Sequence, residues 1–347
     1  MTEVITTQPP KIIRIGVLGA ARIVPIALLK PAGENTEVVV SAVAARDIQR
    51  AKKFASRYAI PTVHASYSEL LANSEIDAIY NPLPNGLHGQ WTIAALQAGK
   101  HVLCEKPFTA NAQEAKAVAE VARPSGLVVM EAFHYRYHAL IDRLLEIIAS
   151  GELGEIRHIE TWMCIPLLAR NIRWNLELAG GAMMDVGCYA IHLLRTLAGA
   201  EPDVKSARAR ELKPGVDRFL HAEFGFKDGR TGAITASMLS RRLLAVGARV
   251  EGTEGSLRVS NPIMPQYKHR IVVRKTTGAK RKEKVAPYPS TYAAQLQAFA
   301  DAVLRNQPFP TNIDDAVANM TVIDQCYAAA GMKPRQPTAN FQQEKST

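Results

Sequence analysis

The sequence predicts an α/β protein in which a domain with a parallel sheet precedes a second α/β domain with a large, mostly antiparallel open sheet. Two observations predict this class. Up to about residue 133, short apolar runs rich in β-branched residues alternate with amphipathic helical segments, as in parallel βαβ units. Beyond that point, neighbouring strands joined by short turns indicate an antiparallel sheet. A chain of 347 residues with 47% hydrophobic content can bury two cores.

Five strands and the helices between them are expected in the first domain. Asp47 is well placed to cap the helix that follows the second strand. The strands are expected at 11–18, 36–45, 77–82, 101–107 and 127–133. The helices are expected from the turn after residue 19 to about Lys30, and at 47–58, 85–99 and 111–123.

The second domain is expected to open with one helix and to continue as strands interrupted by a second helix. The first domain is assigned residues 1–133, the second 134–333, and residues 334–347 are expected to form a polar, frayed tail. The helices are expected at 138–154, 182–199, 290–306 and 313–331. The strands are expected from 154 onward, and at 203–211, 218–226, 230–239, 248–254 and 255–260, followed by a hairpin at 267–285.

Composition limits the function classes. The start of the chain lacks a basic region followed by an apolar one, and no run of 18 apolar residues occurs, so we expect a protein that is neither secreted nor membrane-spanning. The four cysteines lie far apart and form no CxxC pattern, which fits a reducing cytoplasm and disfavours a metal cage or a disulfide framework.

Much of the net charge of +10 lies in the hairpin 267–285. A solvated surface hairpin is the favoured interpretation. Attraction of anionic ligands or nucleic acid is the alternative. No aromatic interleaving and no DNA-binding helix pattern accompanies these charges, so a nucleic-acid partner is not expected.

The stretch GVLGAAR follows the first strand and opens a helix, which is the context of a dinucleotide-binding turn. Gly16 and Gly19 would let the backbone approach a pyrophosphate, and the helix N-terminus would face that anion with free N–H groups. Ala21 stands where the third glycine of the pattern usually lies. A plain tight turn between strand and helix is the alternative. The predicted cofactor contacts are therefore Gly16, Gly19, Ala20, Ala21, Arg22 and Ile23.

The end of the second strand indicates which dinucleotide binds. NAD sites usually place Asp or Glu there to bind the ribose 2′-hydroxyl, whereas this chain has Ala45 and Arg46. An arginine pairs with a 2′-phosphate and can stack on adenine. NADP(H) is therefore favoured and NAD(H) is the alternative, with Arg46 as a mere surface residue if the interpretation fails.

Glu105, Lys106 and Pro107 end the strand 101–107 on an ion pair that cannot continue into a helix. Ligands of a doubly wound sheet bind outside the carboxyl ends of its strands. Pro107 lacks a backbone donor and ends the strand there. We therefore expect Glu105 and Lys106 to lie where a nicotinamide would bind.

Four stretches together are similar to one family. AGKHVLCEKP (98–107), NPLPNGLHGQW (81–91) and GGAMMDVGCYAIH (180–192) resemble motifs of the glucose–fructose oxidoreductase/inositol dehydrogenase/MocA (Gfo/Idh/MocA) family, over about residues 11–331. EAFHYRYH (131–138) is similar to the subgroup that contains dimeric dihydrodiol dehydrogenase and NADP-dependent D-xylose dehydrogenase.

The resemblance implies a Rossmann dinucleotide-binding domain followed by an α/β domain whose sheet commonly serves oligomerisation, hence a homodimer or homotetramer. It implies that Lys106 is the catalytic lysine and that Tyr189 holds the family's tyrosine-or-histidine position. It implies that the loop before His88 contacts the nicotinamide end. The loop residues predicted to do so are Pro82, Leu83, Asn85 and His88. Where many sugar-oxidising members have an acid three residues after the tyrosine, this chain has His192.

The expected chemistry is hydride transfer between a nicotinamide and a carbinol or carbonyl carbon of a sugar, sugar derivative or cyclic diol. Tyr189 is the expected acid/base, and Lys106 would lower its pKa and polarise the substrate oxygen. Glu105 would hold the lysine or complete a local ion pair. Asp185 and His192 share a helix face with Tyr189 and could bind hydroxyls or tune the phenol.

Each assignment has a structural alternative. Lys106 could form a structural salt bridge, Tyr189 could face the core, and Asp185 and His192 could face solvent. His88 could cap a helix. His134 and His138 have i,i+4 spacing, but packing beneath the substrate site is favoured over metal binding.

Two further questions stay open from the sequence. Arg170, Arg173 and Trp174, in the loop 167–181, could line the substrate mouth or a subunit interface. A non-catalytic NADP(H)-binding regulator on the same scaffold is the alternative to an enzyme, although the presence of Lys106 and Tyr189 favours the enzyme.

Overall fold

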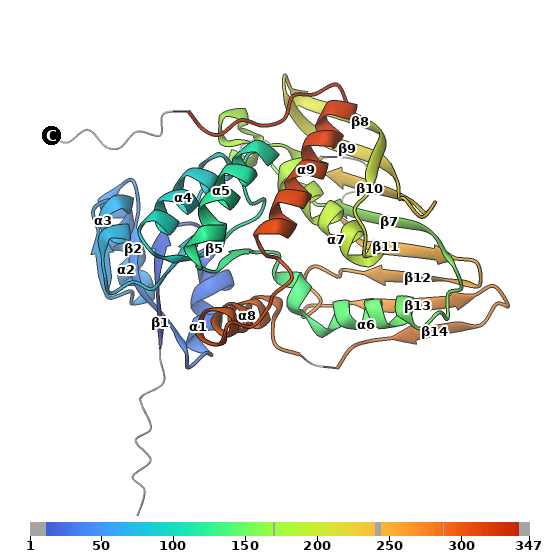
Figure 1. The fold of residues 1–347 in the computed structure, drawn as a ribbon, viewed down its shortest axis with the longest axis horizontal. Helices are drawn as coiled ribbons and strands as arrows, with labels where there is room; N and C mark the ends of the chain where they lie inside the picture. The colour runs from blue at the N-terminus through green and yellow to red at the C-terminus, as the bar shows by residue number, and fades with distance from the viewer. Residues whose placement is uncertain (1–11, 169–170, 240–243, 287, 340–347) are drawn as a thin grey trace, which may run out of the picture.

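The computed structural model describes residues 12–168, 171–239, 244–286 and 288–339. It contains two sheets with helices packed between and around them (Figure 1). The predicted α/β class, with a parallel first sheet and a mostly antiparallel second sheet, is confirmed.

The first sheet is parallel and has the strand order β3-β2-β1-β4-β5-β6. The chain reverses its direction of winding between β1 and β4, and ligands of such sheets bind at the carboxyl edge beside that point. The sequence missed β3, because it has only three residues and none of them is buried. The strands are β1 (Ile13–Leu18), β2 (Val38–Ala44), β3 (Thr62–His64), β4 (Ala78–Asn81), β5 (His101–Cys104) and β6 (Val129–Glu131).

The helices of this half begin where the sequence supplies caps. The side chain of Asp47 accepts hydrogen bonds from the N–H groups of Gln49 and Arg50, which confirms the predicted cap. The helix after the glycine turn starts as a π-helical turn, Pro25–Leu29, before it becomes α-helical. The helices are α1 (Lys30–Gly33), α2 (Ile48–Tyr58), α3 (Tyr67–Ala72), α4 (His88–Gln97) and α5 (Ala112–Ser125).

The second sheet has eight strands in the order β14-β13-β12-β11-β7-β10-β9-β8, and only the β7–β10 pair is parallel. β13 and β14 form the predicted hairpin. The strands are β7 (Ile156–Cys164), β8 (Asp203–Lys213), β9 (Val216–Gly225), β10 (Thr231–Ser237), β11 (Ala245–Gly252), β12 (Gly255–Ser260), β13 (Arg270–Lys275) and β14 (Lys280–Glu283).

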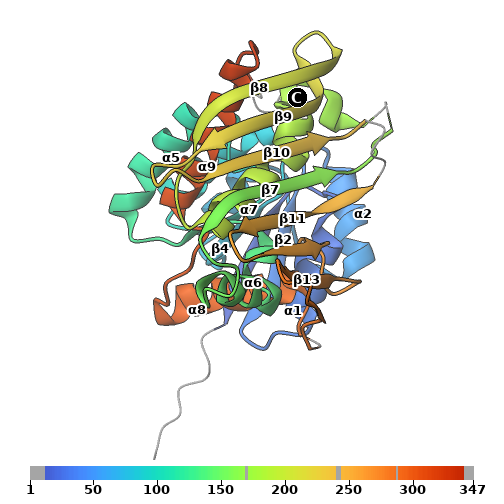
Figure 2. The same cartoon turned by 90° about the vertical axis from the view of Figure 1, so that its right-hand side faces the viewer.

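Helices cover one face of this sheet and leave the other open (Figure 2). Thr161 of β7 donates its hydroxyl to the carbonyl of Ala190 on α7. α7 and the turn before it contain most of the stretch GGAMMDVGCYAIH (180–192) and are called the motif helix below. This bond fixes the motif helix across the centre of the sheet. A π-helical turn, Met183–Gly187, leads into that helix. The helices are α6 (Ala139–Ala149), α7 (Cys188–Ala198), α8 (Thr291–Arg305) and α9 (Ile313–Ala329).

The two C-terminal helices join the halves of the molecule. Leu296 and Phe299 of α8 are buried in one cluster with Ile13 and Ile15 of β1, so α8 completes the core beneath the first sheet. α9 packs against α5 of the first half and β8 of the second (Figure 1). The predicted division between the domains at residue 133 stays a prediction. It assigns α8 to the second domain, although α8 packs in the core of the first sheet.

The expectation of a frayed tail from residue 334 is wrong for residues 334–339. Arg335 is buried, and its guanidinium lies 2.5 Å from the carboxylate of fully buried Asp217. Thr338 donates its N–H to the carbonyl of Gly86 and its hydroxyl to the carbonyl of Glu177. The tail looked frayed because its composition is polar, and a polar segment orders when one of its charges has a buried partner.

The basic hairpin lies along α6 and the turn that follows it. Arg281 pairs with Glu152, and Arg143 of α6 pairs with Glu283 of β14. Carboxylates within the chain thus neutralise part of the charge that raised the question of an anionic partner. All four cysteines are buried, and none of them forms a disulfide bond. No helix of the described residues combines the length and the apolar character that crossing a bilayer requires.

Candidate functional site

The glycine turn lies at the carboxyl end of β1. Gly19 has a φ of +92°, which favours glycine, and donates its N–H to the carbonyl of Ala44 on β2. The next N–H groups at this helix start, those of Ala20, Arg22 and Ile23, donate to no other described group. Open donors at the start of a helix suit a pyrophosphate. The turn therefore fits the predicted dinucleotide.

Gly16 lies inside β1, three residues before Gly19 at the turn. A Cβ atom there would lie 2.6 Å from Leu70 Cδ2 and 3.2 Å from Ile76 Cγ2. The structure thus gives glycine at this position a reason in helix–strand packing. Contact between Gly16 and a pyrophosphate stays a prediction.

The end of β2 brings two arginines near the glycine turn. Ala45 packs with Ala20 of the turn, and Arg46 beside it is exposed. Arg50, four residues later on α2, donates from Nη2 to the carbonyl of Ala20 at 2.9 Å. The sequence interpretation missed Arg50, which lies on α2 beyond the cap at Asp47, whereas Arg46 lies just outside that helix.

The loop after β4 is held from both sides. Leu83 packs toward Gly19, since a Cβ on Gly19 would lie 3.1 Å from Leu83 Cδ2. Asn85 donates to the carbonyl of Ala179, across to the second half of the molecule. The loop thus lies between the glycine turn and the segment before the motif helix, and contact of Pro82, Leu83 and Asn85 with a cofactor stays a prediction.

His88 is fully enclosed behind this loop. Its Nδ1 lies 2.7 Å from the carbonyl of Pro107 and its Nε2 2.6 Å from the carbonyl of Leu83. Burial lowers the pKa of His88 to about 4. The imidazole ties the loop to the segment after β5. It does not cap α4, so the capping alternative is wrong, and direct contact with a cofactor stays a prediction.

Lys106 follows β5 and reaches into the second half of the molecule. Its Nζ lies 2.9 Å from the carbonyl oxygen and 3.3 Å from Oδ1 of Asp185. Glu105 instead accepts from the hydroxyl of Tyr80 at 2.8 Å and from the N–H of Lys106. The expectation that the Glu105 carboxylate holds the lysine ammonium is therefore wrong. Asp185 holds it, because the motif helix brings that carboxylate to the edge of the first sheet.

Asp185 is shared by two cations. Arg173, from the loop before the motif helix, donates from Nε to Asp185 Oδ1 at 2.6 Å. Burial opposes ionisation of Asp185, but the charges of Lys106 and Arg173 outweigh it and the pKa of Asp185 is lowered. Burial likewise acts to lower the pKa of Lys106, but Asp185 outweighs it and the pKa is raised. Both groups are ionised at neutral pH.

Tyr189 lies beside this ion pair. The Nζ of Lys106 is 5.0 Å from the centroid of the phenol ring, and the hydroxyl is 3.1 Å from Nε2 of His134. Burial raises the pKa of Tyr189 well above its usual value. The expectation that the pKa of Tyr189 is lowered is thus wrong, because desolvation of the phenolate dominates.

Among the described residues of the loop 167–181, Arg173 contributes its side chain to this cluster. Arg173 reaches Asp185, whereas Trp174 is buried and donates its indole N–H to the carbonyl of Leu168 at 3.0 Å. The side chain of Trp174 therefore does not line a mouth. Arg170 lies outside the described residues.

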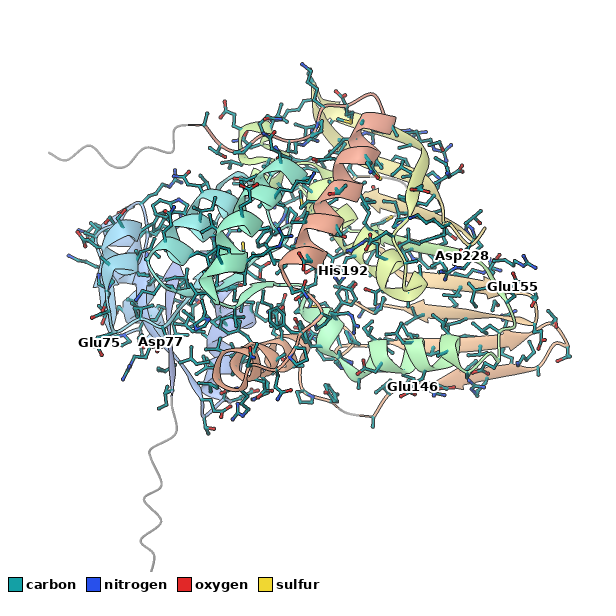
Figure 3. The ribbon with its side chains drawn as sticks, viewed as in Figure 1. Glu75, Asp77, Glu146, Glu155, His192 and Asp228 are labelled. Carbon is teal, nitrogen blue, oxygen red and sulfur yellow. The ribbon has the colours of Figure 1, made fainter. Side chains whose placement is uncertain are left out.

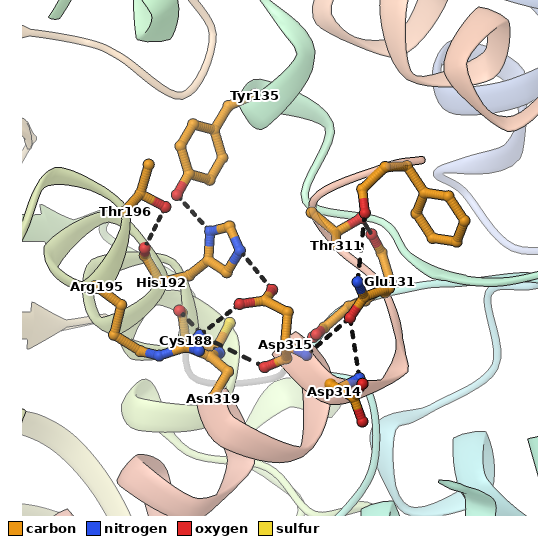
Figure 4. A network of polar contacts seen from close by, with 12 residues as sticks. Glu131, Tyr135, Cys188, His192, Arg195, Thr196, Thr311, Asp314, Asp315 and Asn319 are labelled. Carbon is orange, nitrogen blue, oxygen red and sulfur yellow. Dashed lines mark hydrogen bonds and ion pairs between the residues drawn. The ribbon is translucent and has the colours of Figure 1, made fainter. Parts of the chain in front are cut away.

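His192 lies in a different network. Its Nδ1 is 2.5 Å from the hydroxyl of Tyr135 and its Nε2 is 2.9 Å from Asp315, which also binds Arg195 (Figure 4). Figure 3 places His192 in the interior beside α9, while labelled carboxylates such as Glu75 and Glu155 lie at the rim. Both ring nitrogens are thus engaged away from Lys106 and Tyr189, and a role of His192 in proton transfer stays a prediction.

His134 and His138 have separate surroundings. His134 contacts Tyr189 and the hydroxyl of Thr291, whereas His138 accepts from the N–H of Leu140 and caps α6. Among the described residues no three or more His, Cys, Asp or Glu side chains are grouped to hold a metal ion. The predicted packing beneath the site thus fits His134, and the sequence missed its bond to the phenol.

Fold and site together define a protein with a Rossmann-type parallel sheet and a second, mostly antiparallel sheet, in which Lys106 and Tyr189 lie close together where the two halves join. The profile described as the oxidoreductase family with an NAD-binding Rossmann fold matches residues 13–133, and that of the GFO/IDH/MocA C-terminal domain matches 141–258. The chain belongs to the Gfo/Idh/MocA oxidoreductase family, which confirms the family resemblance.

Characterised relatives match most of the chain. D-xylose 1-dehydrogenase (NADP(+)) 2 of Haloferax volcanii is 36% identical over 91% of this chain and 96% of its own. Trans-1,2-dihydrobenzene-1,2-diol dehydrogenase of Sus scrofa is 32% identical over 66% of this chain and 68% of its own. A 3-ketoreductase of Actinomadura kijaniata, in complex with NADP and TDP-benzene, superposes with a TM-score of 0.85 at 28% identity and covers 92% and 98%.

Proposed function

We propose that this protein is an NADP(H)-dependent oxidoreductase that transfers a hydride between the nicotinamide and a hydroxyl or carbonyl carbon of a sugar, sugar derivative or cyclic diol. One observation carries the proposal. Lys106 from the first half and Tyr189 from the second converge at the carboxyl edge of the parallel sheet, 5.0 Å from ammonium to ring centroid. Relatives named for xylose and dihydrodiol oxidation, and a ketoreductase crystallised with NADP, support the substrate class.

The cofactor assignment draws on the turn and on the two arginines. The open N–H groups after Gly19 would bind the pyrophosphate, and Arg46, together with Arg50, which bonds to the glycine turn, would pair with the 2′-phosphate of NADP(H). When bound, the nicotinamide supplies or accepts the hydride. NAD(H) remains the alternative cofactor, since an arginine does not repel a free ribose hydroxyl.

The side chains supply the rest of the reaction. Lys106, kept charged by Asp185, polarises the substrate oxygen and stabilises the alkoxide that forms when the carbonyl carbon gains hydride. Tyr189 donates its phenolic proton to that oxygen, and its raised pKa keeps the proton on the phenol at neutral pH. In the oxidative direction the same proton returns to the tyrosine.

A panel of aldoses, ketosugars, deoxyketosugar nucleotides and cyclic diols tests this function, with NADPH absorbance as the readout for both directions. We expect turnover with at least one class and a preference for NADP(H). NADPH binding without turnover on any member of the panel would instead favour a non-catalytic, NADP(H)-binding regulator. An NADP(H) affinity too weak to detect would contradict both.

We also propose that the open face of the second sheet joins copies of the chain into a homodimer or homotetramer. Helices cover only the opposite face (Figure 2). Trp162 lies on the open face under the guanidinium of Arg258, which is 5.4 Å from the indole centroid. A broad sheet face with an aromatic–arginine contact suits a subunit interface. A cytoplasmic location stays a prediction.

A further inference from the structure

His134 is the hydrogen-bond partner of the Tyr189 phenol. It lies in the short 3₁₀ turn His134–Tyr137 that follows β6, and its ring is fully enclosed. Nε2 lies 3.1 Å from the Tyr189 hydroxyl, and Nδ1 lies 2.8 Å from Oγ1 of Thr291. The ring of Tyr292 packs against the imidazole with a centroid separation of 4.1 Å. Three elements thus fix one imidazole against one phenol.

The two contacts of the imidazole allow two arrangements of protons. Burial lowers the pKa of His134 to about 3, so the ring is neutral and carries one N–H. If Nδ1 carries it, Nε2 must accept the phenolic proton, which then points away from a substrate. If Nε2 carries it, the phenol oxygen accepts from His134 and keeps its own proton free. Thr291 permits the second arrangement, because its hydroxyl can donate to Nδ1.

We propose that His134 is the positioning residue of Tyr189: Thr291 donates to Nδ1, Nε2–H donates to the phenol oxygen, and the phenolic proton stays directed toward the substrate. This inference rests on the proposed function. After Tyr189 gives its proton to the substrate alkoxide, the Nε2–H of His134 stabilises the phenolate that remains. No other bond forms or breaks, and the proton returns to the phenol when the next substrate is oxidised or from solvent.

The other groups that face the phenol do not supply this bond. Lys106 and Asp185 are paired with each other, Glu105 accepts from Tyr80, and Cys188 carries a thiol whose pKa burial raises to about 12. Tyr292, Tyr80 and Tyr135 are further titratable neighbours, and burial raises the pKa of each of them. A change in the ionisation of Tyr189 after substitution of His134 would therefore report the lost imidazole N–H.

Paired substitutions separate the bond from the shape of the side chain. His134→Phe removes both nitrogens, whereas His134→Gln keeps a donor near the position of Nε2. Thr291→Val removes the hydroxyl at constant shape, and Thr291→Ser keeps it. A hydrogen bond to a charged group corresponds to roughly a ten- to hundredfold change in rate. We expect His134→Phe and Thr291→Val to lower kcat by that factor with KM within about threefold.

The conservative variants and the pH profile identify the mechanism. His134→Gln and Thr291→Ser should recover most of kcat. In His134→Phe, the rate of substrate oxidation should need a higher pH, because a phenolate that lacks its donor is harder to form. His138→Phe, a histidine of the same segment that caps α6, is the control, and its pH profile should match that of the wild type. An unchanged kcat and profile in His134→Phe would overturn the proposal.

A measurement that needs no turnover decides the proton arrangement. In protein labelled with ¹⁵N-histidine, the His134 signals are those lost in His134→Phe. We expect a protonated Nε2 and an unprotonated Nδ1 in the wild type, and a change of this pattern in Thr291→Val. A protonated Nδ1 in the wild type would overturn the inference. Wild-type protein that turns over no sugar or diol would contradict the proposed function, while this measurement would still test the histidine.

Discussion

Lys106 owes its charge and its direction to a residue 79 positions away. Asp185 offers it both a backbone carbonyl and a carboxylate, and Arg173 binds the same carboxylate oxygen, Oδ1. A buried ammonium without such a partner would lose its proton or turn to water. The ion pair is therefore what keeps a positive charge beside Tyr189 at neutral pH.

Replacing Lys106 by alanine should remove turnover but leave the cofactor bound. Loss of one charge that stabilises a developing oxyanion lowers kcat by about 10²- to 10³-fold. We expect this loss in steady-state assays, with NADPH affinity by fluorescence within a few-fold of the wild type. Lys100→Ala is the matched control: this lysine precedes the same strand and donates to the carbonyls of Asn73 and Ile76, away from the site. It should retain kcat. Wild-type turnover in Lys106→Ala would exclude the lysine from the mechanism.

Arg46→Ala tests the cofactor preference at the other end of the site. A charge-assisted bond to the 2′-phosphate should make KM for NADPH rise roughly ten- to hundredfold, while KM for NADH changes little. Arg57→Ala, in the last turn of α2, the helix that follows Arg46, is the control and should leave both values unchanged. Equal effects of Arg46→Ala on the two cofactors would contradict the NADP assignment.

The motifs predicted which residues cluster at this site but not the bonds between them. Lys106, Asp185 and Tyr189 do cluster, as expected from their motifs. The partner of Lys106 was misjudged, because Glu105 adjoins it in sequence whereas Asp185 adjoins it only after the domains pack. The sign of the Tyr189 pKa shift was misjudged for a similar reason, since burial is a property of the packed core and has no local sequence signal.

At the scale of elements, the C-terminal segment 334–339 bonds to both halves of the molecule. Arg335 donates to the carbonyl of Gly180 and to Asp217, and Asp217 accepts from the N–H of Met183 at the start of the motif helix. Thr338 then reaches Gly86 in the loop predicted to contact the nicotinamide. The segment thus connects the motif helix with the loop that follows β4. Its polar composition hides this role from sequence reasoning, whereas the periodic helices and strands were predictable.

Arg335→Ala should destabilise the fold strongly. Removing one partner of a buried ion pair costs about 3–5 kcal/mol, because the remaining charge is left without compensation. We expect a drop of this size in the free energy of unfolding measured by chemical denaturation. Lys333→Ala, which removes an exposed cation two residues earlier, should change it by less than about 0.5 kcal/mol.

A double variant checks that the effect belongs to the pair. Asp217 also accepts from the hydroxyl of Tyr327 at 2.9 Å, so Asp217→Asn keeps a polar group there without the charge. In the Arg335→Ala background, Asp217→Asn should cost less than it does alone, because no charge is left unpaired. Additive losses would mean that Arg335 contributes through packing on the ring of Tyr327 and not through its charge.

At the scale of the whole molecule, the second sheet is covered on one side only. Thr161 and Ala236 face the motif helix, since Thr161 bonds to Ala190 and a Cβ on Gly187 would lie 3.1 Å from Ala236. Side chains alternate along a strand, so Trp162 and Thr235, which pair across β7 and β10, face the side opposite the motif helix. The second sheet thus has one face that packs on the motif helix and contributes to the site, and a broad opposite face that helices leave open.

Thr235→Arg should weaken self-association if the open face joins two copies. Thr235 lies in the middle of β10, where its hydroxyl contacts His221 of β9. In a dimer joined through this face, a guanidinium at position 235 would face the sheet of the second copy. We expect a shift toward monomer in sedimentation velocity at equal concentration. Gln97→Arg, the same change of charge on an exposed position of α4, should leave the distribution unchanged. Equal sedimentation of Thr235→Arg and wild type as oligomers would place the interface elsewhere, and a monomeric wild type would contradict the assembly altogether.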